Sequence, residues 1–322
     1  MQNTSQKIYV GIDVSKSTLA INSGIKKMKD IANNVGEIRR TLLSLQRELS
    51  EGQELHVCFE ATGPYTKKIK QVCSEQGIAY STLNPTRVRK YAESMSIAAK
   101  TDAIDAAVIR AYAEHKQPCA DVVKFAHQEE LVELCNLRKN HMDEITRLKG
   151  LLESSTSTFA RKHTKSMIQL MNRRLQALMI QIKKLCLADP MRKAIFQELI
   201  KIEGVGELTA ILALAYAPEI GTLGRRKSAS ISGLAPYPHI SGTMDARRHI
   251  SGGRRSLRLS LYMAALSASM HNSVLKYVYA KKINEGKPSK VALTCIMRKL
   301  FVHMDRVAAR AINLYTADKI SA

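Results

Sequence analysis

Four carboxylates stand at positions where several metal ligands could meet. Asp13 ends one apolar run and Glu60 ends a second, and each run is typical of a buried strand. Neighbouring strands would bring these two acids close together. Asp102 and Asp105 are spaced i and i+3, so a helix would present both on one face. The pattern predicts one acidic site built from two strand ends and one helix.

Such a set of acids suits divalent cations. Four carboxylates close together repel one another unless a cation lies between them, and oxygen ligands favour Mg²⁺ or Mn²⁺. Two such ions, ~3.5–4 Å apart, would clamp the attacking and leaving oxygens of a phosphodiester. The alternative is that each acid caps a helix or pairs with a nearby lysine. Asp102, which follows Thr101, fits a helix start.

A serine in an arginine-rich stretch could act as a nucleophile. Ser241 precedes a glycine, and a serine can attack phosphorus if its proton leaves and cations neutralise the developing charge. Ser232 and Ser251 are rival candidates, and a serine beside glycine is usually a turn residue. The chain has no Gly-x-Ser-x-Gly elbow and no Walker loop, which argues against an ordinary hydrolase or an NTPase.

The charge balance predicts a polyanionic partner. Lys and Arg total 50 against 28 Asp and Glu, a net charge of +22 among 322 residues, and nucleic acid is the simplest polyanion. A solvated basic loop is the alternative for the densest stretch. The side chains that we expect to contact phosphates are Arg225, Arg226, Lys227, Arg247, Arg248, Arg254, Arg255 and Arg258.

A glycine pair lies further upstream, between two helical stretches. Gly204 and Gly206 lack the third glycine and the preceding strand of a dinucleotide fingerprint. A helix-hairpin-helix turn fits better, because backbone N–H groups at glycines can approach a phosphate in front of a helix N-terminus. A plain glycine turn is an equal alternative.

Three regions must position these residues. Residues 1–124 alternate strand and helix patterns, which predicts an α/β domain. The pattern over residues 125–189 predicts an antiparallel helical hairpin that turns at Ser154–Thr158. A heptad seam from Ile168 to Leu185 favours self-association through a coiled coil, and an ordinary two-helix insert packed on its own domain is the alternative. Residues 190–322 are mostly helical, with a loop-rich stretch over 218–253. The fold class is therefore α/β plus α.

The remaining features predict a protein of a reducing compartment. The six cysteines form no Cys-x-x-Cys pair and no zinc-finger spacing with histidine. Residues 1–7 lack the apolar core of a signal peptide, and the longest apolar run, 208–217, is too short to span a bilayer. We expect a cytoplasmic protein.

In combination, these motifs resemble a known family, the DEDD-type insertion-sequence transposases, which include the Piv DNA invertase and the bridge-RNA-guided serine recombinases. The resemblance covers nearly the whole chain in order. It is carried by Gly11-Ile12-Asp13-Val14-Ser15-Lys16, Glu60-Ala61-Thr62-Gly63, Lys100-Thr101-Asp102-Ala103-Ile104-Asp105-Ala106, Gly204-Val205-Gly206, Gly233-Leu234-Ala235-Pro236, Ser241-Gly242 and Leu257-Arg258.

The resemblance implies a RuvC-like, RNase H-type domain, then a coiled-coil segment, then a transposase domain with a helix-hairpin-helix-like turn. The metal-binding acids would be Asp13, Glu60, Asp102 and Asp105. Ser241 would form a covalent phosphoserine link to donor and target DNA, with metal assistance. A structured bridge RNA would guide the reaction, and dimers or tetramers would share sites between subunits in a prokaryotic, nucleoid-associated setting.

One departure from the family pattern and two competing functions must be weighed. Family members often carry a lysine after the Ile-Ser pair, whereas here Ile250-Ser251 is followed by Gly252-Gly253. A RuvC-like structure-specific nuclease would use water as its nucleophile and leave Ser241 structural. A non-enzymatic nucleic-acid-binding scaffold would use the acids only in caps and ion pairs.

Overall fold

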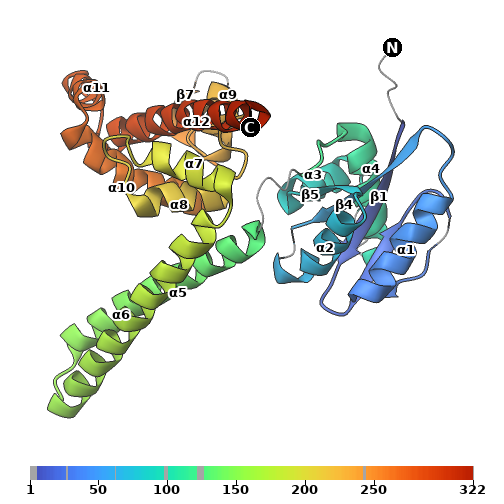
Figure 1. Cartoon of the computed structure of the whole chain (residues 1–322), viewed down its shortest axis with the longest axis horizontal. Helices are drawn as coiled ribbons and strands as arrows, with labels where there is room; N and C mark the ends of the chain where they lie inside the picture. The colour runs from blue at the N-terminus through green and yellow to red at the C-terminus, as the bar shows by residue number, and fades with distance from the viewer. Residues whose placement is uncertain are drawn as a thin grey trace. The chain divides into compact units, whose positions relative to one another are not determined.

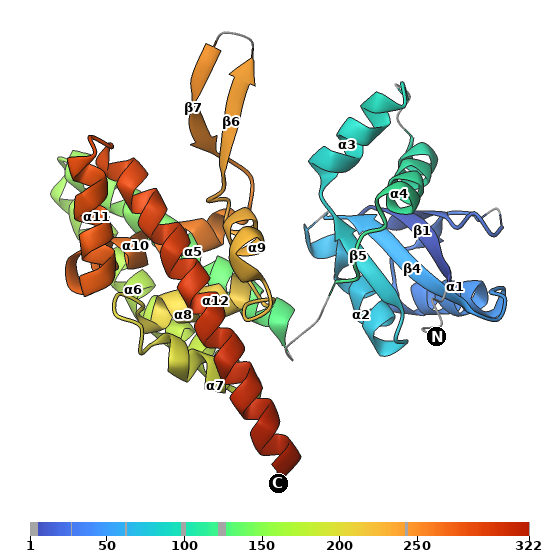
Figure 2. The same cartoon turned by 90° about the horizontal axis from the view of Figure 1, so that it is seen from above.

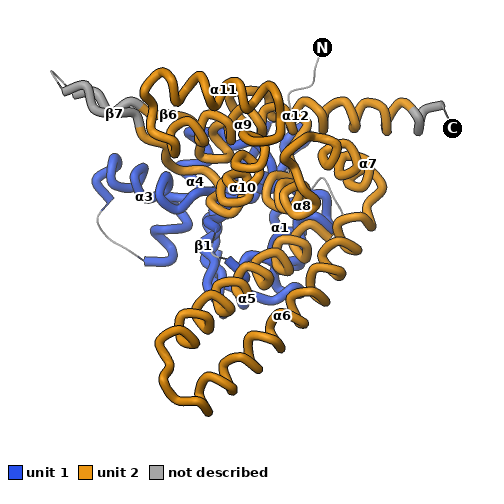
Figure 3. Tube along the Cα trace, turned by 90° about the vertical axis from the view of Figure 1, so that its left-hand side faces the viewer, with its two compact units in different colours: residues 1–122 blue, residues 123–322 orange. Residues whose placement is uncertain are grey.

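The chain forms two compact units in a computed structural model, residues 1–122 and residues 123–322 (Figure 1; Figure 3). The residues that the structure describes are 6–26, 28–61, 63–97, 101–121, 127–241 and 244–321; the side chains of 238–241, 244–248 and 318–321 are outside this description. No helix among these residues is both long and apolar enough to cross a membrane.

The first unit is built on a mixed five-stranded sheet. Its strands lie in the order β3-β2-β1-β4-β5, with β1, β4 and β5 parallel and β2 and β3 antiparallel to their neighbours. The strands are β1 (Gln6–Val14), β2 (Thr18–Asn22), β3 (Ile31–Ala32), β4 (Gln53–Glu60) and β5 (Ala79–Leu83). This mixed sheet, with the helices that cover it, is consistent with the predicted RuvC-like fold.

Helices cover both faces of this sheet, because side chains along each strand alternate between two sides. Val10 and Ile12 face a core with α1 and α2, whereas Tyr9 and Cys58 face a second core with α3 and α4. The helices are α1 (Val35–Arg47), α2 (Lys67–Glu75), which follows a short 3₁₀ turn (Gly63–Thr66), α3 (Pro85–Ser94) and α4 (Asp102–Lys116).

The second unit begins with two long helices, α5 (Gln128–Ser154) and α6 (Thr158–Leu187), which pack side by side (Figure 1). The predicted turn coincides with the gap between them. The heptad residues of α6, such as Ile168 and Ile182, are half-buried or buried, and Ile182 shares a core with Cys135 of α5. Packing within the hairpin therefore covers part of this seam, and self-association through it stays a prediction.

The remainder of the second unit is a helical core with one β-hairpin. Its helices are α7 (Pro190–Leu199), α8 (Glu207–Tyr216), α9 (Gly224–Ile231), α10 (Arg255–His271), α11 (Ser273–Asn284) and α12 (Ser289–Ser321), and β6 (Pro236–Ser241) pairs with β7 (Met244–Ile250) (Figure 2). The prediction of a loop-rich stretch over 218–253 is wrong, because it contains α9 and this hairpin. A separate hairpin domain over 125–189 stays a prediction; α5 and α6 share a core with the helices that follow.

Candidate functional site

The two strand-borne acids lie on the same face of the sheet, at the ends of adjacent strands. In the parallel pair of β1 and β4, Gly11 is paired with Cys58 and Ile12 with Phe59. The next step along both strands reaches Asp13 and Glu60. Cys58 faces α3 and α4, so the alternation of side chains directs Asp13 and Glu60 to that face too.

Helix α4 crosses this face with its first turn toward the same end of the sheet. A Cβ atom on Gly11 would lie 2.2 Å from the carbonyl oxygen of Ala106, so only glycine lets the helix lie this close to β1. Further along α4, Arg110 contacts Gly24 beside the beginning of β1. Asp102 and Asp105, which precede Ala106, therefore lie toward Asp13. Along α4, Asp102 is about 6 Å and Asp105 about 1.5 Å from Ala106, and along β1 Asp13 is about 7 Å from Gly11.

The first turn of α4 also fits the alternative that its acids only stabilise the start of the helix. Thr101 is the N-cap, and its hydroxyl accepts a hydrogen bond from Ile104 N at 3.3 Å. Negative charge is favourable in a first helical turn, which stabilises Asp102 and Asp105 without a ligand. Asp102 is exposed, and Asp13, Glu60 and Asp105 are half-buried, so solvent reaches all four.

The donor set suits a hard divalent cation, since it consists of carboxylates on one edge of the sheet. Among the described residues, however, no three His, Cys, Asp or Glu side chains form a group close enough to hold a metal ion. Mutual repulsion favours separation of carboxylates wherever no cation joins them. The fold thus brings the four predicted ligands to one end of the sheet, and it does not bring them into a closed cluster.

Ser241 lies at the end of β6, where it is paired with Met244 across the hairpin. We expected a loop here; Ser241 and Met244 instead belong to two paired antiparallel strands. The Ser241 side chain is outside the described part of the chain. Of its rivals, Ser232 is fully buried and its hydroxyl donates to Ser228 O at 2.7 Å, whereas Ser251 is exposed.

The base of this hairpin is held by contact between two glycine backbones. Gly233 and Gly253 both have positive φ, and a Cβ on Gly253 would lie 2.1 Å from Gly233 N. Arg258 Nη1 donates to Gly252 O at 2.7 Å. A larger residue at 253 could not fit against Gly233, whereas position 252, where the expected lysine would stand, has open space around its Cβ position and a φ of +67°.

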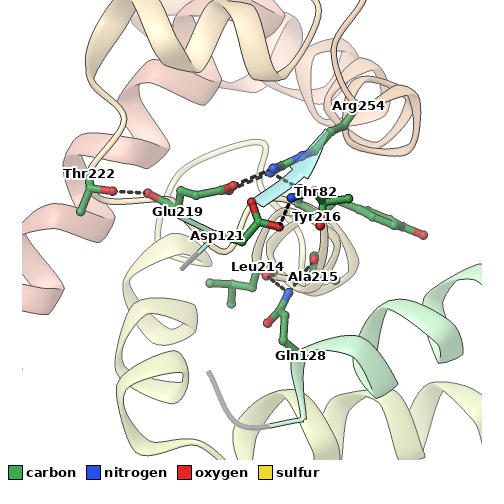
Figure 4. A network of polar contacts seen from close by, with 9 residues as sticks. All are labelled: Thr82, Asp121, Gln128, Leu214, Ala215, Tyr216, Glu219, Thr222 and Arg254. Atoms are coloured by element: carbon green, nitrogen blue, oxygen red, sulfur yellow. Dashed lines mark hydrogen bonds and ion pairs between the residues drawn. The ribbon is translucent and has the colours of Figure 1, made fainter. Parts of the chain in front are cut away.

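Arg254 is already engaged within the fold (Figure 4). Its guanidinium donates to both carboxylate oxygens of Glu219, at 2.6 and 2.7 Å, and to Tyr216 O at 2.8 Å. Its backbone N donates to Ile231 O. These bonds join the start of α10 to the segment after α8, so the structure gives Arg254 a role in fixing the hairpin base, beside the predicted contact with phosphate.

The other predicted basic contacts differ in how well they are placed. Arg225, Arg226 and Lys227 are exposed on α9, and Arg255 is exposed at the start of α10. Arg258 is half-buried over Gly252. Arg247 and Arg248 lie on β7, and their side chains are outside the described part.

Gly204 and Gly206 occupy the connection between α7 and α8, and they have different surroundings. Gly204 has φ +95°, and a Cβ there would lie 2.5 Å from Ala268 Cβ on α10. Gly206 is the N-cap of α8 with φ −81° and open space around its Cβ position. The first glycine is therefore required by packing. The helix-hairpin-helix role of both stays a prediction.

Sequence reasoning named Gly11 only as part of a motif and missed its positioning role. A glycine two residues before the acid on a central strand was the available signal, since glycine inside a strand often marks close approach of another backbone. The position of Ala106 opposite it could not be read from the sequence.

Comparisons with known proteins agree with the motifs. A family model of DEDD-type transposases of the IS110 group matches residues 10–156, and the model described as transposase IS116/IS110/IS902 family matches residues 196–280. The chain is also 27% identical over 301 residues to the pilin gene-inverting proteins of Moraxella bovis and Moraxella lacunata, covering 91% of this chain and 93% of each relative.

Proposed function

From the premise that this chain belongs to the IS110-type transposases and is a DNA recombinase, we propose that it cuts and rejoins DNA through a covalent phosphoserine intermediate. The observation that carries this proposal is the convergence of Asp13, Glu60 and the first turn of α4 at one end of the sheet. A protein that only bound nucleic acid would gain nothing from four acids at one end of the sheet, because they repel phosphates in a chain whose net charge is +22.

The four acids are the proposed holders of Mg²⁺, with Mn²⁺ as a substitute. When bound, a divalent ion would neutralise charge on a phosphodiester and favour its cleavage. Asp13 and Glu60 stand on rigid strands, while Asp102 and Asp105 stand on a helix whose height over β1 is set by Gly11. Carboxylates that solvent reaches, on elements fixed in this way, could close on a cation with small side-chain rotations.

Ser241 is the proposed nucleophile. Its Oγ forms a bond to phosphorus, the bond from phosphorus to one deoxyribose oxygen breaks, and the serine proton is balanced by a proton taken up at that oxygen. The reverse attack by another deoxyribose hydroxyl restores a phosphodiester and frees the serine. One phosphate ester replaces another at each step, so no nucleotide hydrolysis is needed, in keeping with the missing Walker loop.

Donor and target DNA are the proposed substrates, and a structured bridge RNA is the proposed guide. The relatives named as gene-inverting proteins support action on DNA. The charge of +22 supports contact with nucleic acid, DNA and RNA alike. A homodimer or tetramer that shares sites between subunits is part of the same proposal.

The test uses the full chain, purified with the RNA that it retains, and donor and target DNA from the flanks of its gene. Ser241→Ala should abolish covalent protein–DNA adducts on denaturing gels and leave DNA binding nearly unchanged. Asp102→Asn and Asp105→Asn should each lower adduct formation at least about 100-fold, because removal of one catalytic electrostatic partner costs that much.

Other results would separate the alternatives. Adducts that persist in Ser241→Ala would exclude this serine, and full activity of both Asn variants would exclude the metal role of α4. Cleaved free ends without any adduct would favour a RuvC-like nuclease. Binding without cleavage in either Mg²⁺ or Mn²⁺ would favour a scaffold.

A further inference from the structure

Helix α12 carries a row of basic side chains along one exposed face. Lys299, His303, Arg306 and Arg310 follow one another at intervals of four, three and four residues, so they lie in one stripe. All four are exposed, whereas Leu300, Met304 and Ala308 on other sides of the helix are buried. We call the four exposed residues the α12 basic face; it extends over about 16 Å.

Helix α9 adds two further cations beside this face. Asp305, which is buried, accepts hydrogen bonds from Gly221 N and Gly224 N at 2.7 and 2.9 Å. The start of α9 is thereby fixed against the same turn of α12 that carries Arg306. Arg225 and Arg226 are the next residues of α9 and are exposed, and the two helices lie side by side (Figure 2).

These cations have no acidic partners in the part of the chain that the structure describes. No ion pair is formed there by Lys299, Arg306 or Arg310, and Asp305, the only acid from Ser289 to Ala317, is committed to backbone N–H groups. Exposed cations elsewhere in this unit do have partners: Lys139 pairs with Asp143, Arg147 with Glu144 and Lys201 with Glu198. An unneutralised row of this kind attracts an external polyanion.

We propose that the α12 basic face, with Arg225 and Arg226, binds the sugar–phosphate backbone of a double helix. Cations spaced about 4.5–6 Å along a helix can meet successive phosphates. Surfaces that hold single strands add aromatic side chains on which bases stack, and the exposed residues of this face include no Phe, Tyr or Trp. The contact therefore positions nucleic acid without reading its sequence.

This inference rests on the proposed function and adds a binding surface remote in sequence from Ser241. The test compares a triple variant, Lys299→Gln, Arg306→Gln and Arg310→Gln, with a control, Lys139→Gln, Arg147→Gln and Lys201→Gln. Both variants remove three positive charges from exposed side chains of the same unit. Binding of a DNA duplex, an RNA duplex and a single strand is measured across a salt series, with thermal melts to verify folding.

The triple variant should bind a duplex about 10- to 100-fold more weakly at about 100 mM salt. The slope of log K against log salt should fall by about one for each phosphate that is no longer bound, so by about three, and the control should keep the slope of the natural chain. The duplex whose binding falls more, DNA or RNA, identifies the source of the backbone. Arg306→Lys with Arg310→Lys should retain most of the slope.

An equal reduction of binding in the control, an unchanged slope in the triple variant, or a reduction confined to single strands would overturn the proposed face. In those cases the adduct assay with Ser241 would still stand. A natural chain that bound neither duplex would instead contradict the proposed function itself.

Discussion

His56 shows how one buried side chain links the stability of the first unit to pH. It lies on β4, and its Nε2 lies 2.8 Å from Ser81 Oγ, which itself donates to Cys119 O at 2.7 Å. Since the serine hydrogen is used, Nε2 carries the proton of the neutral ring. Burial, together with the nearby charge of Lys7, lowers the pKa of His56 to about 4.

We predict that the first unit loses stability as pH falls from 6.5 toward 4. In that window the unfolded chain binds a proton at His56 that the folded chain excludes, so the folded state is favoured above pH 6.5. The loss should reach about 3 kcal/mol near pH 4. Hydrogen exchange of the β4 amides, corrected for intrinsic rates, measures it.

His56→Asn serves as the control, since an amide can still donate to Ser81 and does not titrate. In this variant, the stability of the first unit should fall less between pH 6.5 and 4, because the contribution of His56 is gone. Equal declines in both chains would mean that other groups cause the acid sensitivity.

At the scale of elements, backbone contacts at glycines decide how helices meet. Gly204 is held against α10 at Ala268, and Gly206 caps α8 with free space around it. We predict that Gly204→Ala destabilises the second unit by about 2–4 kcal/mol, from a left-handed backbone and a close contact with Ala268. Thermal melts followed by circular dichroism check this value.

Gly206→Ser is the matched variant two residues away. Serine is a good N-cap, and the extended backbone at Gly206 suits it, so stability should stay level or rise by about 0.3 kcal/mol. If Gly204 and Gly206 served mainly to let a phosphate approach, the Gly204→Ala variant would keep the stability of the natural chain and lose nucleic-acid binding. That result would contradict the prediction.

At the scale of the whole molecule, the residues of the proposed reaction are divided between the two compact units. The acids belong to residues 1–122 and Ser241 to residues 123–322. If subunits share sites, a mixture of Asp102→Asn chains and Ser241→Ala chains should restore adducts, and only the chain that keeps Ser241 should carry them. Tagging the two chains with different masses shows on a gel which one is linked to DNA.

If dimers form at random, half of them are mixed, and a mixed dimer has one intact site of two. Adduct formation should then recover to about a quarter of that of the natural chain. No adduct in the mixture, with each chain folded and able to bind DNA, would show that each chain supplies both sets of residues itself.

Local patterns predicted strands that end near Asp13 and Glu60, and β1 and β4 are such strands. The metal site itself stays a prediction. Apolar runs that end in Asp13 and Glu60, and an i, i+3 pair at a helix start, depend only on neighbours along the chain. The alternation of strand side chains and the helical repeat then predict which face of its own element each acid occupies. That α4 lies over β1 depends on tertiary packing. The two helices α5 and α6 were also readable locally, because the heptad repeat from Ile168 to Leu185 and the polar turn at Ser154–Thr158 depend only on nearby residues.

Contacts between distant segments were decided by the tertiary structure. Nothing near Gly11 in the chain indicates that Ala106 will lie against it, or that Asp305 will cap α9 from about 80 residues away. The same holds for Arg254, whose chain neighbours suggest a phosphate contact and whose actual partner is Glu219. Such pairings arise only when whole elements pack together, because the atoms that satisfy a buried N–H, a charge or a close backbone approach come from wherever the completed core places them.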